Sequence, residues 1–172
     1  MLNSYYIISE LNSKTKLNLK KNSNINVIYR PNLKEHNNDI LKKIIKTNIY
    51  NKVFIANKNN ICPIKGLSGV YLSAFNKKIL TTSYSKKKII IGSAHSFKEI
   101  REKIKSKCSI IFLSPIFKKK KEIKPIGIIK YLLIRQYFKG ITLVPLGGIS
   151  NPIKLLNYNI KSFAGISYFE TR

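Results

Sequence analysis

The chain has 172 residues, a length that predicts one compact domain spanning residues 1–172. Lysine and arginine together number 33 and aspartate and glutamate 7, so the formal net charge is +26. A charge of this size normally indicates a polyanionic partner. Only four of the cationic residues are arginine, however, which is the residue that phosphate-binding surfaces favour. No specific nucleic-acid partner is therefore expected.

Acidic and sulfur-containing residues are too few for several kinds of site. A single aspartate, Asp39, and six scattered glutamates leave no carboxylate pair for two-metal or glycosidase-type chemistry. Cys62 and Cys108 form no CxxC motif, so we expect two buried thiols in a reducing compartment. The N-terminus lacks a leader-like apolar segment, and no apolar run reaches the ~18 residues of a membrane span. These features predict a cytoplasmic protein with no membrane partner.

Short runs of β-branched and aromatic residues, bounded by turn residues, predict eight β-strands. Most of the runs are apolar throughout instead of alternating, which is typical of strands buried on both faces of a parallel sheet. In chain order the predicted strands are Ser4–Ser9, Ile25–Arg30, Lys52–Asn57, Gly69–Leu72, Lys88–Ala94, Ser109–Phe117, Ile141–Ile149 and Ser162–Phe169.

Helical patterns separate several of these runs. The segments Leu33–Thr47 and Phe97–Lys107 each place apolar residues on one stripe, which predicts two amphipathic helices. Ser96 stands directly before the second helix and Glu99 follows three residues later, the pattern of a capping box. The alternation of strands and helices predicts an α/β protein.

Eight strand and helix units predict a (β/α)8 TIM barrel, shortened because such barrels usually have about 200 to 250 residues. We expect the first and last outer helices to be reduced or missing. The segment Glu10–Asn24 is polar without an apolar stripe and predicts a loop, and only Glu170–Arg172 follow the last strand. Apolar barrel wall would then be exposed on one side, so a homodimer is expected. A doubly wound open sheet is the alternative.

Glycines near the ends of the last two strands predict a phosphate site. Barrels of this kind build their sites from the loops that follow the strands. Gly147 and Gly148 close the seventh run, and Gly165 and Ser167 lie in the eighth. Glycines let backbone N–H groups approach an anion, and Ser150-Asn151 can cap a short helix beside them. A tight turn is the alternative for the glycine pair.

Polar side chains end four other runs: Arg30, Asn57, Ser93 with His95, and Ser114. Each can donate a hydrogen bond to an anion, and His95 can also transfer a proton near neutral pH. Because the carboxyl ends of the strands share one rim of a barrel, these residues predict a pocket for a phosphorylated ligand.

The order and spacing of these motifs resemble thiamine phosphate synthase and its TenI relatives over nearly the whole chain. The block from Gly92 to Ser167 is the most specific part. The matching segments are the strands ending in Arg30 and Asn57, Gly69-Val70-Tyr71-Leu72, Gly92-Ser93-Ala94-His95-Ser96, Phe112-Leu113-Ser114-Pro115-Ile116-Phe117, Leu146-Gly147-Gly148-Ile149 and Ala164-Gly165-Ile166-Ser167.

The resemblance implies a transferase of thiamine biosynthesis. Such an enzyme condenses 4-amino-2-methyl-5-hydroxymethylpyrimidine diphosphate with thiazole phosphate, giving thiamine phosphate and pyrophosphate. By position, the resemblance implies that Arg30 and Asn57 hold pyrophosphate and that Ser93 borders the reacting centre. It implies a thiazole phosphate site made of Gly147, Gly148, Gly165 and Ser167. In the TenI branch, the histidine that matches His95 transfers a proton during thiazole tautomerisation.

The chain departs from the family where its members bind Mg²⁺. Lys58 and Asn76 stand where the synthases carry two metal-binding aspartates, so we predict no metal ligands although the family uses Mg²⁺. Lys118–Lys121 replace a threonine-rich loop that binds pyrophosphate, and Ile28 replaces a glutamine.

These departures leave several interpretations open. In one, Lys58 and the lysine run supply the positive charge of the missing metal, and Lys58 contacts pyrophosphate. In another, the chain is a TenI-like tautomerase or a non-catalytic member that binds thiazole or thiamine phosphates. A basic RNA-binding protein is the alternative from a different class.

Overall fold

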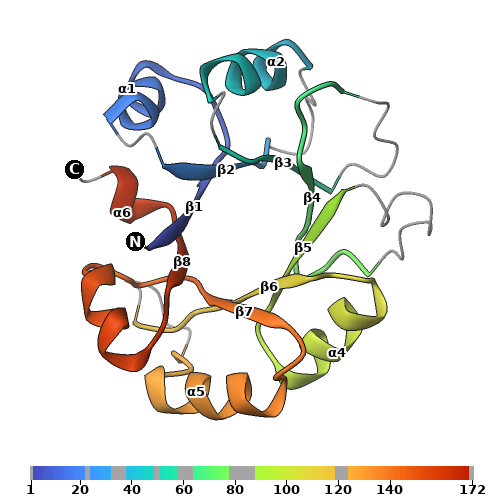
Figure 1. The fold of residues 1–172 in the computed structure, drawn as a ribbon, viewed down its shortest axis with the longest axis vertical. Helices are drawn as coiled ribbons and strands as arrows, with labels where there is room; N and C mark the ends of the chain where they lie inside the picture. The colour runs from blue at the N-terminus through green and yellow to red at the C-terminus, as the bar shows by residue number, and fades with distance from the viewer. Residues whose placement is uncertain are drawn as a thin grey trace.

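The computed structural model describes residues 2–21, 24–31, 38–48, 51–57, 64–77, 88–118 and 124–170. All eight predicted strands are present, and they form one parallel sheet that curls into a barrel (Figure 1). A single parallel bridge between Leu146 and Ala164 connects the last two strands, so the barrel is nearly closed. The strands are β1 (Asn3–Ile8), β2 (Ile25–Tyr29), β3 (Val53–Ala56), β4 (Gly69–Leu72), β5 (Ile89–Ala94), β6 (Ile110–Leu113), β7 (Thr142–Pro145) and β8 (Ser162–Gly165).

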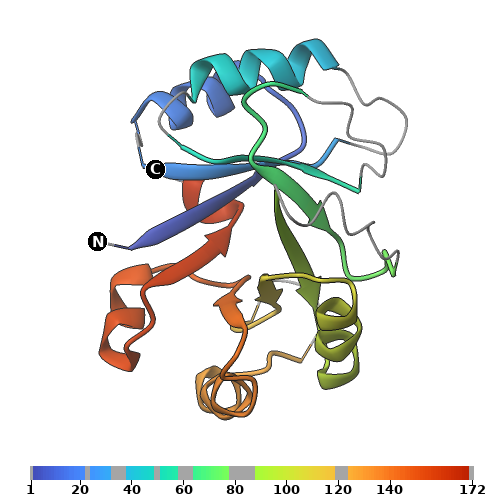
Figure 2. The ribbon, with the colours of Figure 1, turned by 45° about the vertical axis from the view of Figure 1, so that its right-hand side comes forward.

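This arrangement confirms the (β/α)8 barrel and rules out the open sheet. β1 pairs with β2 on one side and with β8 on the other. The two end strands of the sheet, β7 and β8, meet at the bridge between Leu146 and Ala164, whereas an open doubly wound sheet keeps two separate edges. Helices surround the barrel (Figures 1 and 2), and none of those in the described residues is long and apolar enough to cross a membrane. They are α1 (Ser13–Lys21), α2 (Asn38–Thr47), α4 (Phe97–Lys105), α5 (Ile128–Tyr137), the 3-10 helix η1 (Pro152–Tyr158) and α6 (Ser167–Glu170).

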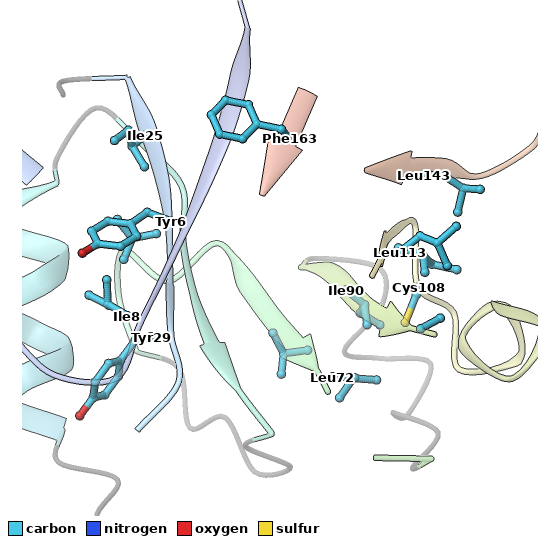
Figure 3. Close-up of a cluster of buried hydrophobic side chains, with 14 of the residues drawn as sticks. Tyr6, Ile8, Ile25, Tyr29, Leu72, Ile90, Cys108, Leu113, Leu143 and Phe163 are labelled. Carbon is cyan, nitrogen blue, oxygen red and sulfur yellow. The ribbon is translucent and has the colours of Figure 1, made fainter. Parts of the chain in front are cut away.

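Alternate residues of the strands build two separate apolar layers. The inner layer fills the barrel, where the rings of Tyr5 and Tyr71 pack against Phe112 at centroid distances of 5.1 and 5.8 Å. The outer layer lies between the strands and the helices, and Figure 3 shows Tyr6 and Tyr29 in it. Burying one such large side chain contributes about 1.5 to 3 kcal/mol, and this double burial explains why the strands are apolar throughout.

The predicted cap of α4 is present, with one change of partner. The Ser96 hydroxyl accepts a hydrogen bond from the backbone N–H of Glu99 at 3.2 Å. The Glu99 carboxylate accepts from the backbone N–H of His95 at 2.8 Å, and not from that of Ser96. The capping pair therefore also fixes the backbone of His95.

The expectation of a loop over residues 10–24 is wrong, because α1 has nine residues there. Its buried face is mostly polar, formed by Thr15, Asn18 and Leu19. Thr15 and Asn18 both lie close to the phenol of Tyr6 on the outer side of β1, where burial raises the pKa of this phenol and the two side chains lower it. The Asn12 side chain begins the helix by accepting from the backbone N–H of Thr15 at 2.8 Å. A helix that packs against a tyrosine hydroxyl needs no apolar stripe.

The last outer helix is short, as expected, since α6 has four residues. Because α1 covers the neighbouring wall, the physical reason given above for a homodimer no longer holds. Among the described residues, exposed apolar side chains form a stripe on another helix, α5. The stripe consists of Ile129, Leu133 and Tyr137.

Candidate functional site

The carboxyl ends of β2, β4, β5 and β6 enclose a cavity of about 230 Å³, which we call the central cavity. Four residues predicted from the sequence line it: Arg30 after β2, Ser93 in β5, His95 after β5 and Ser114 after β6. The structure thus brings these four side chains together at one cavity. The other residues that line it are Ile7, Tyr71, Ser73, Ala74, Phe75, Leu146 and Ile166.

Tyr71 connects two of the predicted residues across the floor of this cavity. The residue is 2 % exposed, and its phenol lies close to both Ser93 and Arg30. Burial raises the pKa of Tyr71, while Ser93 and the charge of Arg30 oppose the rise. The phenol therefore stays protonated near neutral pH. Sequence reasoning placed Tyr71 only in a strand, and its inward direction depends on strand register.

His95 is held through one ring nitrogen. Nδ1 lies 2.8 Å from the carbonyl oxygen of Ser114 and 3.2 Å from the Ser114 hydroxyl. A carbonyl oxygen only accepts, so Nδ1 carries the proton in this contact and the lone pair of the neutral ring is on Nε2. His95 can therefore act as a base through Nε2 at the rim of the central cavity.

Asn57 lies outside the lining of the central cavity and binds the turn that follows β4. Its side-chain oxygen accepts from the backbone N–H of Ser73 at 3.0 Å, from the Ser73 hydroxyl at 2.9 Å and from the Asn76 amide at 3.2 Å. Its φ of 54° is left-handed, a conformation that asparagine tolerates well. Any hydrogen bond from the Asn57 side chain to an anion would have to come from its Nδ2 group.

The predicted phosphate-site residues Gly147, Gly148, Gly165 and Ser167 all line a second, narrow cleft of about 30 Å³, which we call the glycine cleft. Gly147 and Gly148 have φ values of 90° and 73°. A Cβ on Gly148 would lie 2.5 Å from the carbonyl oxygen of Phe117, so only glycine fits there.

The central cavity and the glycine cleft adjoin, because Leu146 and Ile166 line both of them. Beside the glycine cleft, Asn151 caps η1 as predicted, accepting from the backbone N–H of Ile153 at 3.1 Å. The site therefore consists of two adjoining compartments.

Several predicted cationic residues fall outside what the structure describes. Lys58 and residues 119–121 of the lysine run are not among the described residues, so their predicted roles stay predictions. Lys118 is exposed at the end of the segment that follows β6.

The residues at the end of β4 do not fit a Mg²⁺ ion. Mg²⁺ is bound by oxygen ligands, usually with at least one carboxylate. The described residues contain no group of three or more His, Cys, Asp or Glu side chains that could hold a metal. The backbone oxygens of Ser73 and Asn76 accept instead from the ammonium of Lys103, at 2.6 Å for Ser73. A cation of the protein thus already occupies the oxygens on this side.

Comparisons with known proteins give structural neighbours only. No protein-family model matches the chain, and no curated protein sequence does. A thiamine phosphate pyrophosphorylase from Pyrococcus furiosus matches with a TM-score of 0.72 and 19 % identity, over 96 % of this chain and 86 % of that chain. The 2-keto-3-deoxy-6-phosphogluconate aldolase of Zymomonas mobilis matches with a TM-score of 0.60 and 12 % identity, over 97 % of this chain and 81 % of that chain. A structure described as native KDPGal matches with a TM-score of 0.60 and 8 % identity, over 96 % of this chain and 82 % of that chain.

These similarities support the (β/α)8 barrel, in agreement with the strand order. The same fold carries different activities, so the activity has to be argued from the site.

Proposed function

We propose that this protein is a thiamine phosphate synthase-like transferase, which binds a pyrimidine diphosphate and a thiazole phosphate side by side. The observation that carries the proposal is that the central cavity and the glycine cleft adjoin at Leu146 and Ile166. The proposed condensation joins two anionic substrates, and their reacting atoms have to meet. Two adjoining compartments provide that arrangement. The fold similarity to a thiamine phosphate pyrophosphorylase supports the same substrates.

In the proposed reaction, the bond between the exocyclic methylene carbon and the diphosphate oxygen breaks, and its electron pair leaves with pyrophosphate. The lone pair of the thiazole nitrogen then forms the new carbon–nitrogen bond, so no oxidant or reductant is needed. The barrier depends on how well the developing charge of pyrophosphate is stabilised. Arg30, which lies beside Tyr71 in the central cavity, is the described side chain best placed to donate to it.

The glycine cleft would hold the phosphate of the thiazole substrate. Its two left-handed glycines carry no Cβ, which leaves backbone N–H groups accessible to phosphate oxygens. The Ser167 hydroxyl adds one more donor at the cleft. The thiazole ring would then extend past Leu146 and Ile166 toward the central cavity.

The direct test is to incubate the full chain with both substrates and to measure thiamine phosphate and pyrophosphate, in Mg²⁺ and in chelator. Arg30→Gln is expected to lower kcat/KM by about 100-fold, the scale of losing one donor to a developing anion. Arg101→Gln is the matched control, because Arg101 lies on the surface of α4 and contacts Tyr137. Absence of both products from the unaltered chain under either condition contradicts the proposal.

A tautomerase-like activity is the second candidate, and the geometry of His95 favours it. The free Nε2 of His95 is suited to moving a proton at a bound thiazole phosphate. In this case His95→Gln should slow interconversion of the thiazole tautomers by about 100-fold or more, as followed by NMR. A synthase that does not need His95 keeps its condensation activity in the same variant, which separates the two candidates.

A further inference from the structure

Among the lysines that the structure describes, one is buried. Lys103 in α4 is 1 % exposed, and its aliphatic stem lies against β5 at Gly92. A Cβ on Gly92 would be 3.0 Å from both Cγ and Cδ of Lys103. The glycine therefore leaves room for the stem to pass from the helix layer toward the turn after β4.

The ammonium of Lys103 holds that turn. It donates to the carbonyl oxygen of Ser73 at 2.6 Å and also to that of Asn76. Asn76 in turn donates its backbone N–H to the Ser73 oxygen at 3.0 Å, which closes the turn. Asn57 binds the same two residues from the β3 side through its side-chain oxygen. The turn is thus held from two directions by side chains that carry no negative charge.

The positive charge of Lys103 has no ion-pair partner in the described part of the chain. The nearby Glu102 forms its ion pair with Lys77, at 3.6 Å. Burial lowers the pKa of Lys103, and the nearby Cys108, Glu99 and Glu102 only oppose that shift. A buried cation is costly unless carbonyl oxygens or an anion compensate it.

The turn that Lys103 holds also forms a wall of the central cavity. Ser73, Ala74 and Phe75 all line that cavity, so an anion bound there would lie next to the residue that Lys103 contacts. We infer that Lys103 is a positioning residue and fixed counter-charge for a diphosphate anion in the central cavity, so that this anion binds without a metal ion. The inference rests on the proposed function for the identity of the anion.

The test measures binding of inorganic pyrophosphate to the full chain by isothermal titration calorimetry, in millimolar Mg²⁺ and in chelator. We expect binding in both buffers, because the lysine supplies charge without a metal. Lys103→Met removes charge and donors, and Lys103→Gln removes the charge but keeps an amide donor. Both are expected to weaken binding by about 10-fold, or about 1.4 kcal/mol. Lys105→Met is the control, since Lys105 is exposed on the same helix.

Hydrogen exchange gives the second measurement. Exchange over residues 73–77 should speed up in Lys103→Met and stay close to that of the unaltered chain in Lys103→Gln. Unchanged pyrophosphate affinity in Lys103→Gln overturns the counter-charge role. A strict need for Mg²⁺ in the unaltered chain also overturns it, even if neither variant folds. No binding by the unaltered chain in either buffer contradicts the proposed function as well.

Discussion

The two compartments of the site are built in different ways. The glycine cleft at β7 and β8 is formed by backbone, with Gly147, Gly148 and Gly165 on its lining. The β4 side of the central cavity is instead held by side chains. Asn57 and Lys103 both form hydrogen bonds with Ser73, in the turn after β4. A backbone site depends on the absence of a Cβ, whereas a side-chain network depends on every partner being present. Single substitutions should therefore affect the two compartments differently.

The largest effect is expected from Gly148→Ala. The new Cβ would meet the backbone of Phe117 at 2.5 Å and would also require a φ of 73°. We expect a loss of about 3 kcal/mol in the free energy of unfolding, measured in urea, because strain and overpacking add. Gly127→Ala is the control, since its φ is 80° but nothing lies within 4 Å of the new Cβ. It should cost only about 1 kcal/mol. Equal losses would show that contact with Phe117 is unimportant.

Asn57→Gly should have the next largest effect and tests the side-chain network. Glycine suits the left-handed φ of 54°, so the variant removes hydrogen bonds without adding strain. Ser73 and Asn76 lose their shared acceptor, at a cost of about 2 kcal/mol in unfolding free energy. Asn57→Asp keeps an oxygen acceptor and should lose less. If both variants lose the same free energy, the hydrogen bonds at that oxygen do not hold the turn.

Tyr131 of α5, which contacts β7, predicts how the stability of the fold changes with pH. Its phenol donates to the carbonyl oxygen of Leu143 at 2.8 Å, and burial raises its pKa from 10.0 to about 12. Between these values the unfolded chain loses the phenol proton before the folded chain does. The stability from this group is therefore complete below pH 10 and is lost as the pH rises toward 12.

Tyr131→Phe should cost about 1 kcal/mol at neutral pH and make alkaline unfolding less steep between pH 10 and 12. Urea titrations across this range, with Tyr137→Phe as an exposed control, would measure it. An unchanged slope would mean that Tyr131 does not control the alkaline transition.

The smallest effect is expected from Ser114→Ala, in the lining of the central cavity. The variant removes the hydroxyl contact to His95 at 3.2 Å but keeps the carbonyl contact at 2.8 Å. Unfolding free energy should change by about 0.5 kcal/mol, and tautomerase activity by less than about 3-fold. A loss as large as that of His95→Gln would assign the orientation of the ring to the hydroxyl.

Strands were easier to predict than helices or strand ends. The apolar runs identified all eight strands because each strand is buried on both faces. The sixth to eighth predicted strands were too long, since apolar residues such as Ile116 and Ile149 continue into the loops beyond them and are also buried there. α1 was missed because its buried face meets the hydroxyl of Tyr6 and is polar itself.

By itself, the sequence determined the order of the elements, the glycines of one compartment and the polar groups at the strand ends, because these depend on local residue type and spacing. Only the tertiary structure decided which polar groups act together. Composition could not distinguish Lys103 from 28 other lysines, since its burial depends on Gly92 and on the turn after β4. Tyr71 and Asn57 likewise acquire their partners only when distant strands become neighbours in the barrel.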